Sequence, residues 1–153
     1  MKIVKICLLI LWMTLIFYFS NQNAVQSSNA SDGFISKTVV KVYKVFYVNE
    51  SVEDTEEIIS KYTYPIRKLA HYSLYFVLGI LIYFTLKDYT NNNLLLYSLL
   101  FCFFYACTDE FHQLFVMGRS ASFKDVFLDT FGSFCSILII TIINKRRKYS
   151  CVK

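Results

Sequence analysis

Four long apolar runs limit what this chain can fold into more than any other feature of its sequence. They cover residues 3–20, 69–86, 94–116 and 126–143. A helix of about 20 apolar residues crosses the roughly 30 Å hydrocarbon core of a bilayer, and a spanning segment must satisfy its own backbone hydrogen bonds. The sequence therefore predicts an all-α integral membrane protein, a four-helix bundle that forms a single domain over residues 1–153.

The composition supports the same class of protein. Apolar residues make up 56% and charged residues 18% of the 153 positions, against about 45–50% and roughly 25% in an average soluble domain. A soluble oligomer with a large apolar core is the alternative, and the length of the runs disfavours it. No Lys/Arg stripe interleaved with aromatics predicts a nucleic-acid partner. None of the five cysteines forms a CxxC pair, so the pattern favours neither a disulfide framework nor a structural zinc site.

The ends of the first two runs carry further signals. Lys2 and Lys5 precede the first run as in a signal sequence, but no small-x-small cleavage site follows Ser20, which predicts an uncleaved anchor. In the long connection that follows, residues 33–48 place apolar side chains on one helical face and lysines on another. This pattern predicts an extracytoplasmic amphipathic helix on the membrane surface, or alternatively a short helix packed on the bundle. Pro65 is predicted to be the first helical residue of the second span.

The basic residues predict the orientation of the bundle. The 16 Lys and Arg residues divide equally between the two sides, but the quartet Lys145–Lys148 and the N-terminal lysines flank spans directly, where the positive-inside rule is strongest. Both termini are therefore predicted to be cytoplasmic, although Arg67 and Lys68 argue for the opposite orientation.

Polar residues of all four runs converge on one side of the membrane in this topology. Short connections join the last three spans, so these helices are antiparallel neighbours. Charged groups within spans are costly and are candidate functional residues by default. Counting about 1.5 Å per residue places Asp109 near the headgroup boundary. The converging residues are Ser20, Arg67, Lys68, His71, Asp109, Glu110, His112, Gln113, Arg119, Ser122, Asp125 and Asp129.

Helical spacing groups these residues by face. Lys68, His71, Tyr72 and Tyr75 share one face of the second span, and Asp109, His112 and Gln113 share one face of the third. Asp125, Asp129 and Gly132 align on the fourth. Structural alternatives stay open: a polar network that only holds the bundle, a capping box of Ser122 with Asp125, a snorkelling Lys68, an ion pair of Asp129 with a basic neighbour, and simple helix packing at Gly132 and Ser136.

At these residues the sequence resembles the VanZ-like family of small bacterial membrane proteins. Asp129 stands where that family often has Asn, and Met117 where it commonly has Pro. Residues 28–63 carry little of the resemblance. The matching pieces are Trp12–Ser20 with Gln22 and Ser27, Arg67-Lys68-x-x-His71 with Tyr75, Asp109-Glu110-Phe111-His112-Gln113, Gly118-Arg119, Ser122-x-x-Asp125, and Asp129-Thr130-x-Gly132.

The resemblance implies a multi-pass protein of the bacterial cell membrane, related to one associated with low-level resistance to teicoplanin, a lipid-tailed glycopeptide antibiotic. We expect an outer-leaflet polar pocket whose partners are membrane lipids and a lipid-linked envelope molecule or a glycopeptide. Two sets of residues are predicted to form it: Asp109, Glu110, His112 and His71 for acid–base chemistry, and Lys68, Arg67, Gln113, Arg119, Asp125, Ser20 and Tyr75 for ligand binding.

Other functions stay open. Whether the pocket is catalytic is undecided. A non-catalytic scaffold or a small transporter subunit, in which the polar cluster is structural, is the second class of function; four helices are few for a transporter acting alone, and a homo-oligomer would ease that objection. No cofactor is expected. Two histidines and several carboxylates could hold a divalent metal, but no HExxH-type signature favours it.

The predicted orientation can be tested at Cys151, in the basic C-terminal tail. A membrane-impermeant maleimide should label Cys151 only after the membrane is permeabilised, because the tail is cytoplasmic. The variant Cys151→Ser shows that the signal comes from this residue, and Asn29→Cys in the long connection should be labelled in intact cells. Labelling of Cys151 from outside intact cells would reverse the assignment.

Overall fold

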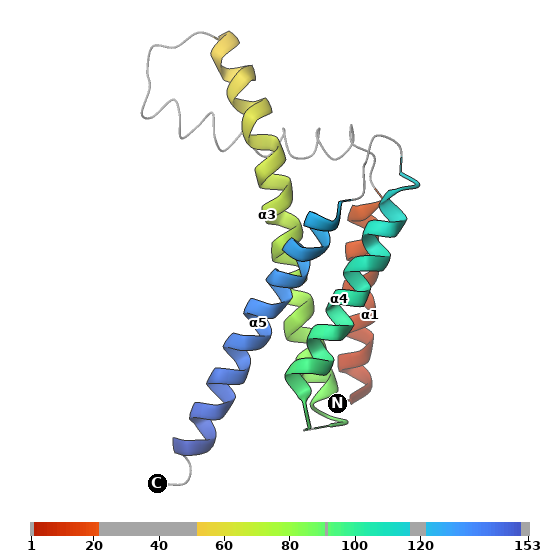
Figure 1. Ribbon diagram of the computed structural model, residues 1–153, viewed down its shortest axis with the longest axis vertical. Coiled ribbons are helices and arrows are strands. Elements are labelled where there is room, and N and C mark those ends of the chain that lie inside the picture. The colour runs from red at the N-terminus through yellow and green to blue at the C-terminus, as the bar shows by residue number, and fades with distance from the viewer. Residues whose placement is uncertain (1, 22–51, 91, 117–121, 151–153) are drawn as a thin grey trace.

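The computed structural model describes residues 2–21, 52–90, 92–116 and 122–150, and in this part of the chain it is built from four helices (Figure 1). They are α1 (Lys2–Ser20), α3 (Val52–Leu86), α4 (Leu94–Gln113) and α5 (Phe123–Ser150). Each contains a segment long and apolar enough to cross a membrane: Lys2–Ser20, Lys68–Leu86, Leu94–Gln113 and Phe123–Arg146. The prediction of an all-α protein with four membrane helices is therefore confirmed.

Successive helices run in opposite directions, so both termini lie at one end of the bundle (Figure 1). α3 and α5 make the most extensive contact, α4 packs against α5 and α3, and α1 lies against α3 and, to a lesser extent, α4. The opposite end contains the last turns of α1 and α4, the first turn of α5, and the turns of α3 near His71. We call this end the polar end, because the predicted site residues whose side chains the structure describes lie there.

The start of α3 differs from the prediction. α3 begins at Val52, and Pro65 lies inside it, so the prediction that Pro65 is the first helical residue is wrong. Proline removes one backbone hydrogen bond of a helix and strains one turn. The preceding residues offset this cost, because Glu56 and Glu57 have high helix propensity and Ile58 is well tolerated in a helix. The helix therefore continues on both sides of Pro65, and α3 extends past the other helices at the polar end (Figure 1).

Three other helix ends are shifted from the predicted boundaries. α4 stops at Gln113 with Leu114 as its C-cap, three residues before the predicted end of the third span. α5 begins at Phe123 and continues beyond the predicted end of the fourth span, through Lys145 and Arg146. The predicted amphipathic helix over residues 33–48 lies outside the described residues.

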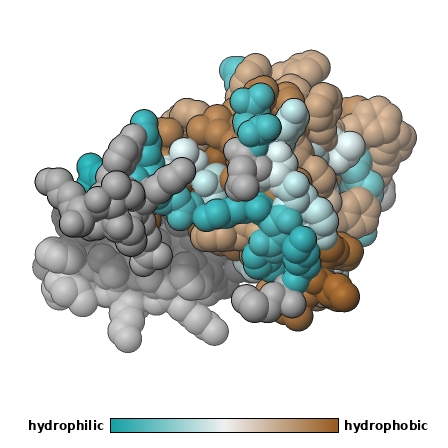
Figure 2. All heavy atoms as spheres, turned by 90° about the horizontal axis from the view of Figure 1, so that it is seen from below, coloured by the Kyte–Doolittle hydropathy of each residue, from teal (hydrophilic) through white to brown (hydrophobic). Residues whose placement is uncertain are grey.

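Burial follows the pattern expected in a bilayer. Large apolar side chains such as Phe104, Phe131 and Ile142 are exposed on the outside of the bundle, where lipid would cover them. Figure 2 looks onto the end with the termini, where hydrophilic side chains gather while apolar ones flank the bundle. The buried core of the described residues is small. Its apolar members are Leu9, Ile16, Tyr75, Leu78, Ile82, Tyr83, Cys102, Ala106, Val126 and Ile137.

Small residues let α3 and α5 approach closely. A Cβ atom added at Gly132 would meet the Tyr72 carbonyl oxygen at 2.7 Å, and one added at Gly79 would collide with Ser136. The Ser133 hydroxyl donates a hydrogen bond of 2.9 Å to the Tyr75 carbonyl. The alternative that Gly132 and Ser136 serve helix packing is thus confirmed, as expected where small residues bring membrane helices together.

An ion pair closes the end of the bundle where the termini lie. The Lys5 ammonium donates a hydrogen bond of 2.7 Å to Asp88, in the turn after α3. This hydrogen bond lowers the pKa of the Asp88 carboxyl from its usual value. Because the folded-state pKa is depressed, the stabilisation from this pair is present at neutral pH and is lost as the pH falls through that lowered pKa.

The close packing of α3 on α5 predicts that Gly132→Ala is destabilising. The added methyl group overlaps backbone of the facing helix and should cost about 1–3 kcal/mol of unfolding free energy. The measurement is the unfolding free energy of the purified protein in detergent. Ser73→Ala is the matched control, because Ser73 is exposed and its hydroxyl donates a hydrogen bond within its own helix, to the Leu69 carbonyl. Equal stability of the two variants would contradict the packing described here.

Candidate polar site within the membrane bundle

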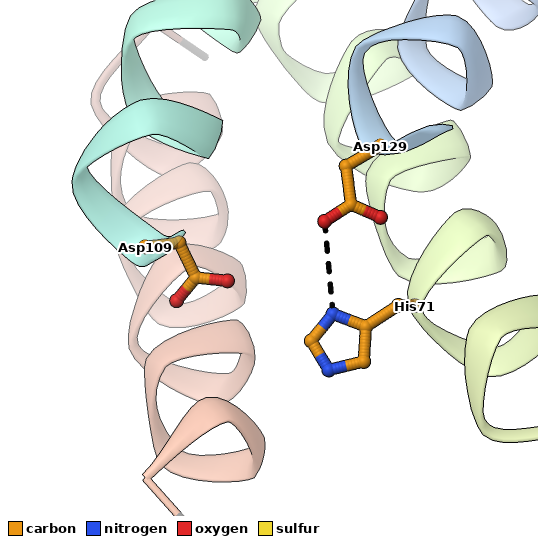
Figure 3. Close-up of side chains that lie close together, drawn as sticks. All are labelled: His71, Asp109 and Asp129. Carbon is orange, nitrogen blue, oxygen red and sulfur yellow. Dashed lines mark ion pairs between the residues drawn. The ribbon is translucent and has the colours of Figure 1, made fainter. Parts of the chain in front are cut away.

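Three side chains from three helices meet at the polar end. His71 comes from α3, Asp109 from α4 and Asp129 from α5. One ligand-type atom of each lies within 4.8 Å of those of the other two, and His71 Nδ1 lies 3.8 Å from Asp129 Oδ2. Figure 3 shows the two carboxylates and the imidazole pointing into a common space. We call these three residues the buried triad.

The triad combines like charges with deep burial. Asp109 and Asp129 are only 3% and 2% exposed. At an effective dielectric constant of about 20, two ionised carboxylates about 5 Å apart repel each other by roughly 3 kcal/mol. A partly buried imidazole between them offsets this only when it is charged, so the arrangement requires a compensating positive charge or a shared proton.

Hydrogen bonds hold one side of the triad in place. The Tyr75 hydroxyl donates to Asp109 Oδ2 over 3.3 Å, and Tyr75 is itself completely buried. The other carboxylate oxygen, Asp109 Oδ1, is buried and makes no hydrogen bond among the described residues, although the Ser20 hydroxyl lies near this carboxyl group. A buried oxygen without a donor is costly, which marks this oxygen as a position for a group that binds it.

Two further contacts surround the triad on the α5 side. Lys68 of α3 forms an ion pair with Asp125 in the first turn of α5. Glu110 of α4 accepts a hydrogen bond of 3.0 Å from the backbone N–H of Ser122. Both contacts tie the start of α5 to a neighbouring helix and so fix Asp129, one turn further along.

Contacts with α1 complete the polar end. The Gln113 side-chain amide donates a hydrogen bond of 2.9 Å to the Ser20 hydroxyl, and both groups are buried. The His112 ring packs on Phe17, with ring centroids 4.3 Å apart. Its Nδ1 is buried without a hydrogen-bond partner in the described part of the chain. The His112 side chain therefore points toward α1, whereas the Asp109 side chain points toward His71 and Asp129.

The structure sorts the predicted site residues into three groups. The first group is brought together: His71 and Asp109 belong to the triad, Tyr75 donates to Asp109, Lys68 pairs with Asp125, and Gln113 donates to Ser20. The second group, Glu110 and His112, lies beside the triad: Glu110 accepts a hydrogen bond from Ser122, and the His112 ring packs on Phe17. The Arg67 side chain and all of Arg119 fall outside the described residues. The catalytic and binding roles assigned to these residues remain predictions.

Asp129 is the residue that the predicted site did not include. The sequence feature that pointed to Asp129 was its position one turn after Asp125, on the same face of a membrane helix. We interpreted it as a partner of a basic neighbour, and His71 is the neighbour that it faces. The structure gives it the deepest burial of the three triad residues.

An apolar groove lies beside the polar end, between α3 and α5. It has a volume of about 410 Å³, is open on one side, and is lined by Pro65, Lys68, Leu69, Tyr72 and Leu128. Lys68 thus belongs both to the groove wall and to the ion pair with Asp125.

Fold and site together define a multi-pass membrane protein with a buried polar cluster at one end of a four-helix bundle. The VanZ/LLP1 family model matches residues 5–144, so the chain belongs to this family. The match includes every residue of the triad and of the groove. No curated protein and no solved structure matches the chain.

The ion pair of Lys68 with Asp125 predicts energetic coupling between α3 and α5. In a double-mutant cycle with Lys68→Met and Asp125→Asn, the pair should show a coupling energy of about 1 kcal/mol or more, because both side chains are mostly buried. Unfolding in detergent measures it. The same cycle on Lys5 and Asp88, whose lysine is more exposed, should give a smaller value. No coupling at Lys68 would mean that this lysine only snorkels to the headgroups.

Proposed function

We propose that this VanZ-family protein binds an anionic, lipid-tailed molecule of the cell envelope at its polar end. The observation that carries the proposal is the double position of Lys68, which lines an apolar groove and also reaches the charged cluster. A ligand with an apolar tail and a negative headgroup would match both surfaces. The tail would lie in the groove, and the headgroup would lie at Lys68.

The groove has the properties that an acyl or polyprenyl chain requires. Leu69, Leu128 and the Tyr72 ring form its walls, and its open side allows a chain to enter sideways from the bilayer. Lipid-binding sites are generally apolar with a few well-placed polar groups. Lys68 is the cation of this groove wall, and an ammonium group binds phosphate as a point charge.

The expected orientation narrows the ligand class. With both termini in the cytoplasm, the polar end faces the outer leaflet, at headgroup depth. Lipid-linked cell-wall precursors and lipid-tailed glycopeptides such as teicoplanin combine an apolar tail with a polar head in that leaflet. The resemblance to a protein associated with teicoplanin resistance favours this class, and a contribution to lipoglycopeptide resistance is part of the proposal.

Filling the groove tests the proposal. Leu128→Trp should weaken binding of a polyprenyl phosphate to the purified protein by at least about tenfold, equivalent to about 1.4 kcal/mol, because the indole occupies the space of the tail. Leu138→Trp is the matched control, since Leu138 lies on the same helix and faces outward. Native mass spectrometry measures the bound lipid, with the uncharged polyprenol as a comparison for the role of the headgroup.

Cells that depend on the protein for lower teicoplanin susceptibility should lose that effect with Leu128→Trp and keep it with Leu138→Trp, at equal membrane levels. Equal lipid binding by both variants would overturn the groove as the tail site. Equal binding of polyprenol and polyprenyl phosphate by the unmodified protein would overturn the role of the anionic headgroup.

A further inference from the structure

We infer that the buried triad is a binding site for a first-row divalent cation such as Mn²⁺ or Zn²⁺. The sequence alone did not favour a metal, because its histidines and carboxylates form no HExxH-type signature. The inference rests on geometry, on an oxygen without a donor and on charge. It does not depend on the lipid ligand proposed above.

The geometry brings three metal-ligand side chains from three helices to one point. His71, Asp109 and Asp129 each offer a ligand atom, and these atoms lie within 4.8 Å of one another. Ligand atoms that share one ion, each about 2.0–2.2 Å from it, lie about 3–4 Å apart. Side-chain rotations that shift these atoms by about an ångström would bring them to an ion, and in Figure 3 all three groups already face the same space.

The unpartnered oxygen points to a ligand independently of the spacing. Asp109 is 3% exposed, its Oδ2 accepts a hydrogen bond from Tyr75, and its Oδ1 makes no hydrogen bond among the described residues. A carboxylate with one oxygen held by a second residue and the other turned to a cation is the usual arrangement of an oriented metal ligand.

Among the described side chains of the polar end, negative charge exceeds positive charge, and a cation would reduce this excess. Among the buried and half-buried side chains described at this end, four carboxylates surround one ammonium, that of Lys68, and the imidazole of His71. Lys68 is already paired with Asp125, and Glu110 is bonded to a backbone N–H. A divalent cation between Asp109 and Asp129 would neutralise the two most deeply buried charges.

The ligand types indicate which cations fit. One imidazole nitrogen with two carboxylate oxygens suits Zn²⁺ and Mn²⁺ better than Ca²⁺, which prefers oxygen ligands alone. Three protein ligands leave coordination positions open for water or for an oxygen of another molecule.

The test uses the full-length protein in detergent, first stripped with a chelator and desalted. Titration with MnCl₂ or ZnCl₂ should give one bound ion per chain by elemental analysis. Asp109→Asn, Asp129→Asn and His71→Gln, which keep side-chain shape approximately, should each weaken binding by at least about tenfold. Asp88→Asn, at the opposite end of the bundle, is the control carboxylate, and His112→Gln is the control histidine; both should retain the ion.

A spectroscopic measurement keeps the test decisive if a variant folds poorly. Pulsed electron paramagnetic resonance of Mn²⁺ bound to the unmodified protein should show coupling to one imidazole nitrogen, and His112→Gln should preserve it. Absence of a stoichiometric ion, absence of nitrogen coupling, or loss of that coupling in His112→Gln would each overturn the inference. Equal binding by Asp109→Asn, Asp129→Asn and the unmodified protein would assign the triad to a structural network and overturn it too.

Discussion

The cost of an unpaired charge inside a bilayer governs how these four helices are arranged. A charged group inside a membrane helix is costly unless a polar or charged group of a neighbouring segment pairs with it. α3 shows this most clearly, because three side chains on one of its faces each contact a different aspartate of α4 or α5. Lys68 meets Asp125, His71 faces Asp129, and Tyr75 bonds to Asp109.

These pairings fix the depth and the rotation of three helices relative to one another. A shift of α5 by one residue would turn Asp125 and Asp129 by about 100° around the helix, away from Lys68 and His71. The buried carboxylates would then lack partners, which is more costly than losing the interaction alone. The polar end thus determines the register of the bundle, and the apolar outer surfaces, which contact lipid in any register, do not.

Packing further along α3 and α5 makes the pairings reachable. Gly132 lies against the Tyr72 backbone, and the Ser133 hydroxyl bonds to the Tyr75 carbonyl. Both contacts lie within about a turn of Asp129 and His71. Small residues at this crossing therefore serve the site as well as stability, since a wider spacing of the two backbones would separate the imidazole from the carboxylate.

The number of spans and the polar faces could be predicted from the sequence because both depend on periodicity within one helix. The i, i+3 and i+7 spacing correctly grouped Lys68, His71 and Tyr75. The pairing between helices could not be predicted, because periodicity gives the face of each helix but not its register against another. His112 illustrates this: three residues after Asp109 it is rotated by about 60°, enough to turn it toward Phe17.

Pro65 shows a second limit of local signals. Proline is favoured at the first position of a helix, yet membrane helices also tolerate it in their interior, and the sequence around it fits both cases. Its place within α3 has a consequence for the site. Because the helix continues past the bundle, Pro65 and Leu69 line the groove next to Lys68. A helix that started at Pro65 would place its less stable first turn at the groove wall.

The distribution of charge divides the polar end into two regions. The α4–α5 interface is acidic, since it contains Asp109, Glu110 and Asp129 as well as the carbonyl-rich C-terminal end of α4, where the helix dipole is negative. Lys68 stands on the other side, at the groove, with Asp125 between the two regions. A cation held among the carboxylates would reduce the negative potential that an approaching anionic headgroup meets, and would thereby favour its contact with Lys68. The same few side chains would in this way accommodate opposite charges at adjacent positions, which a uniformly basic pocket could not do.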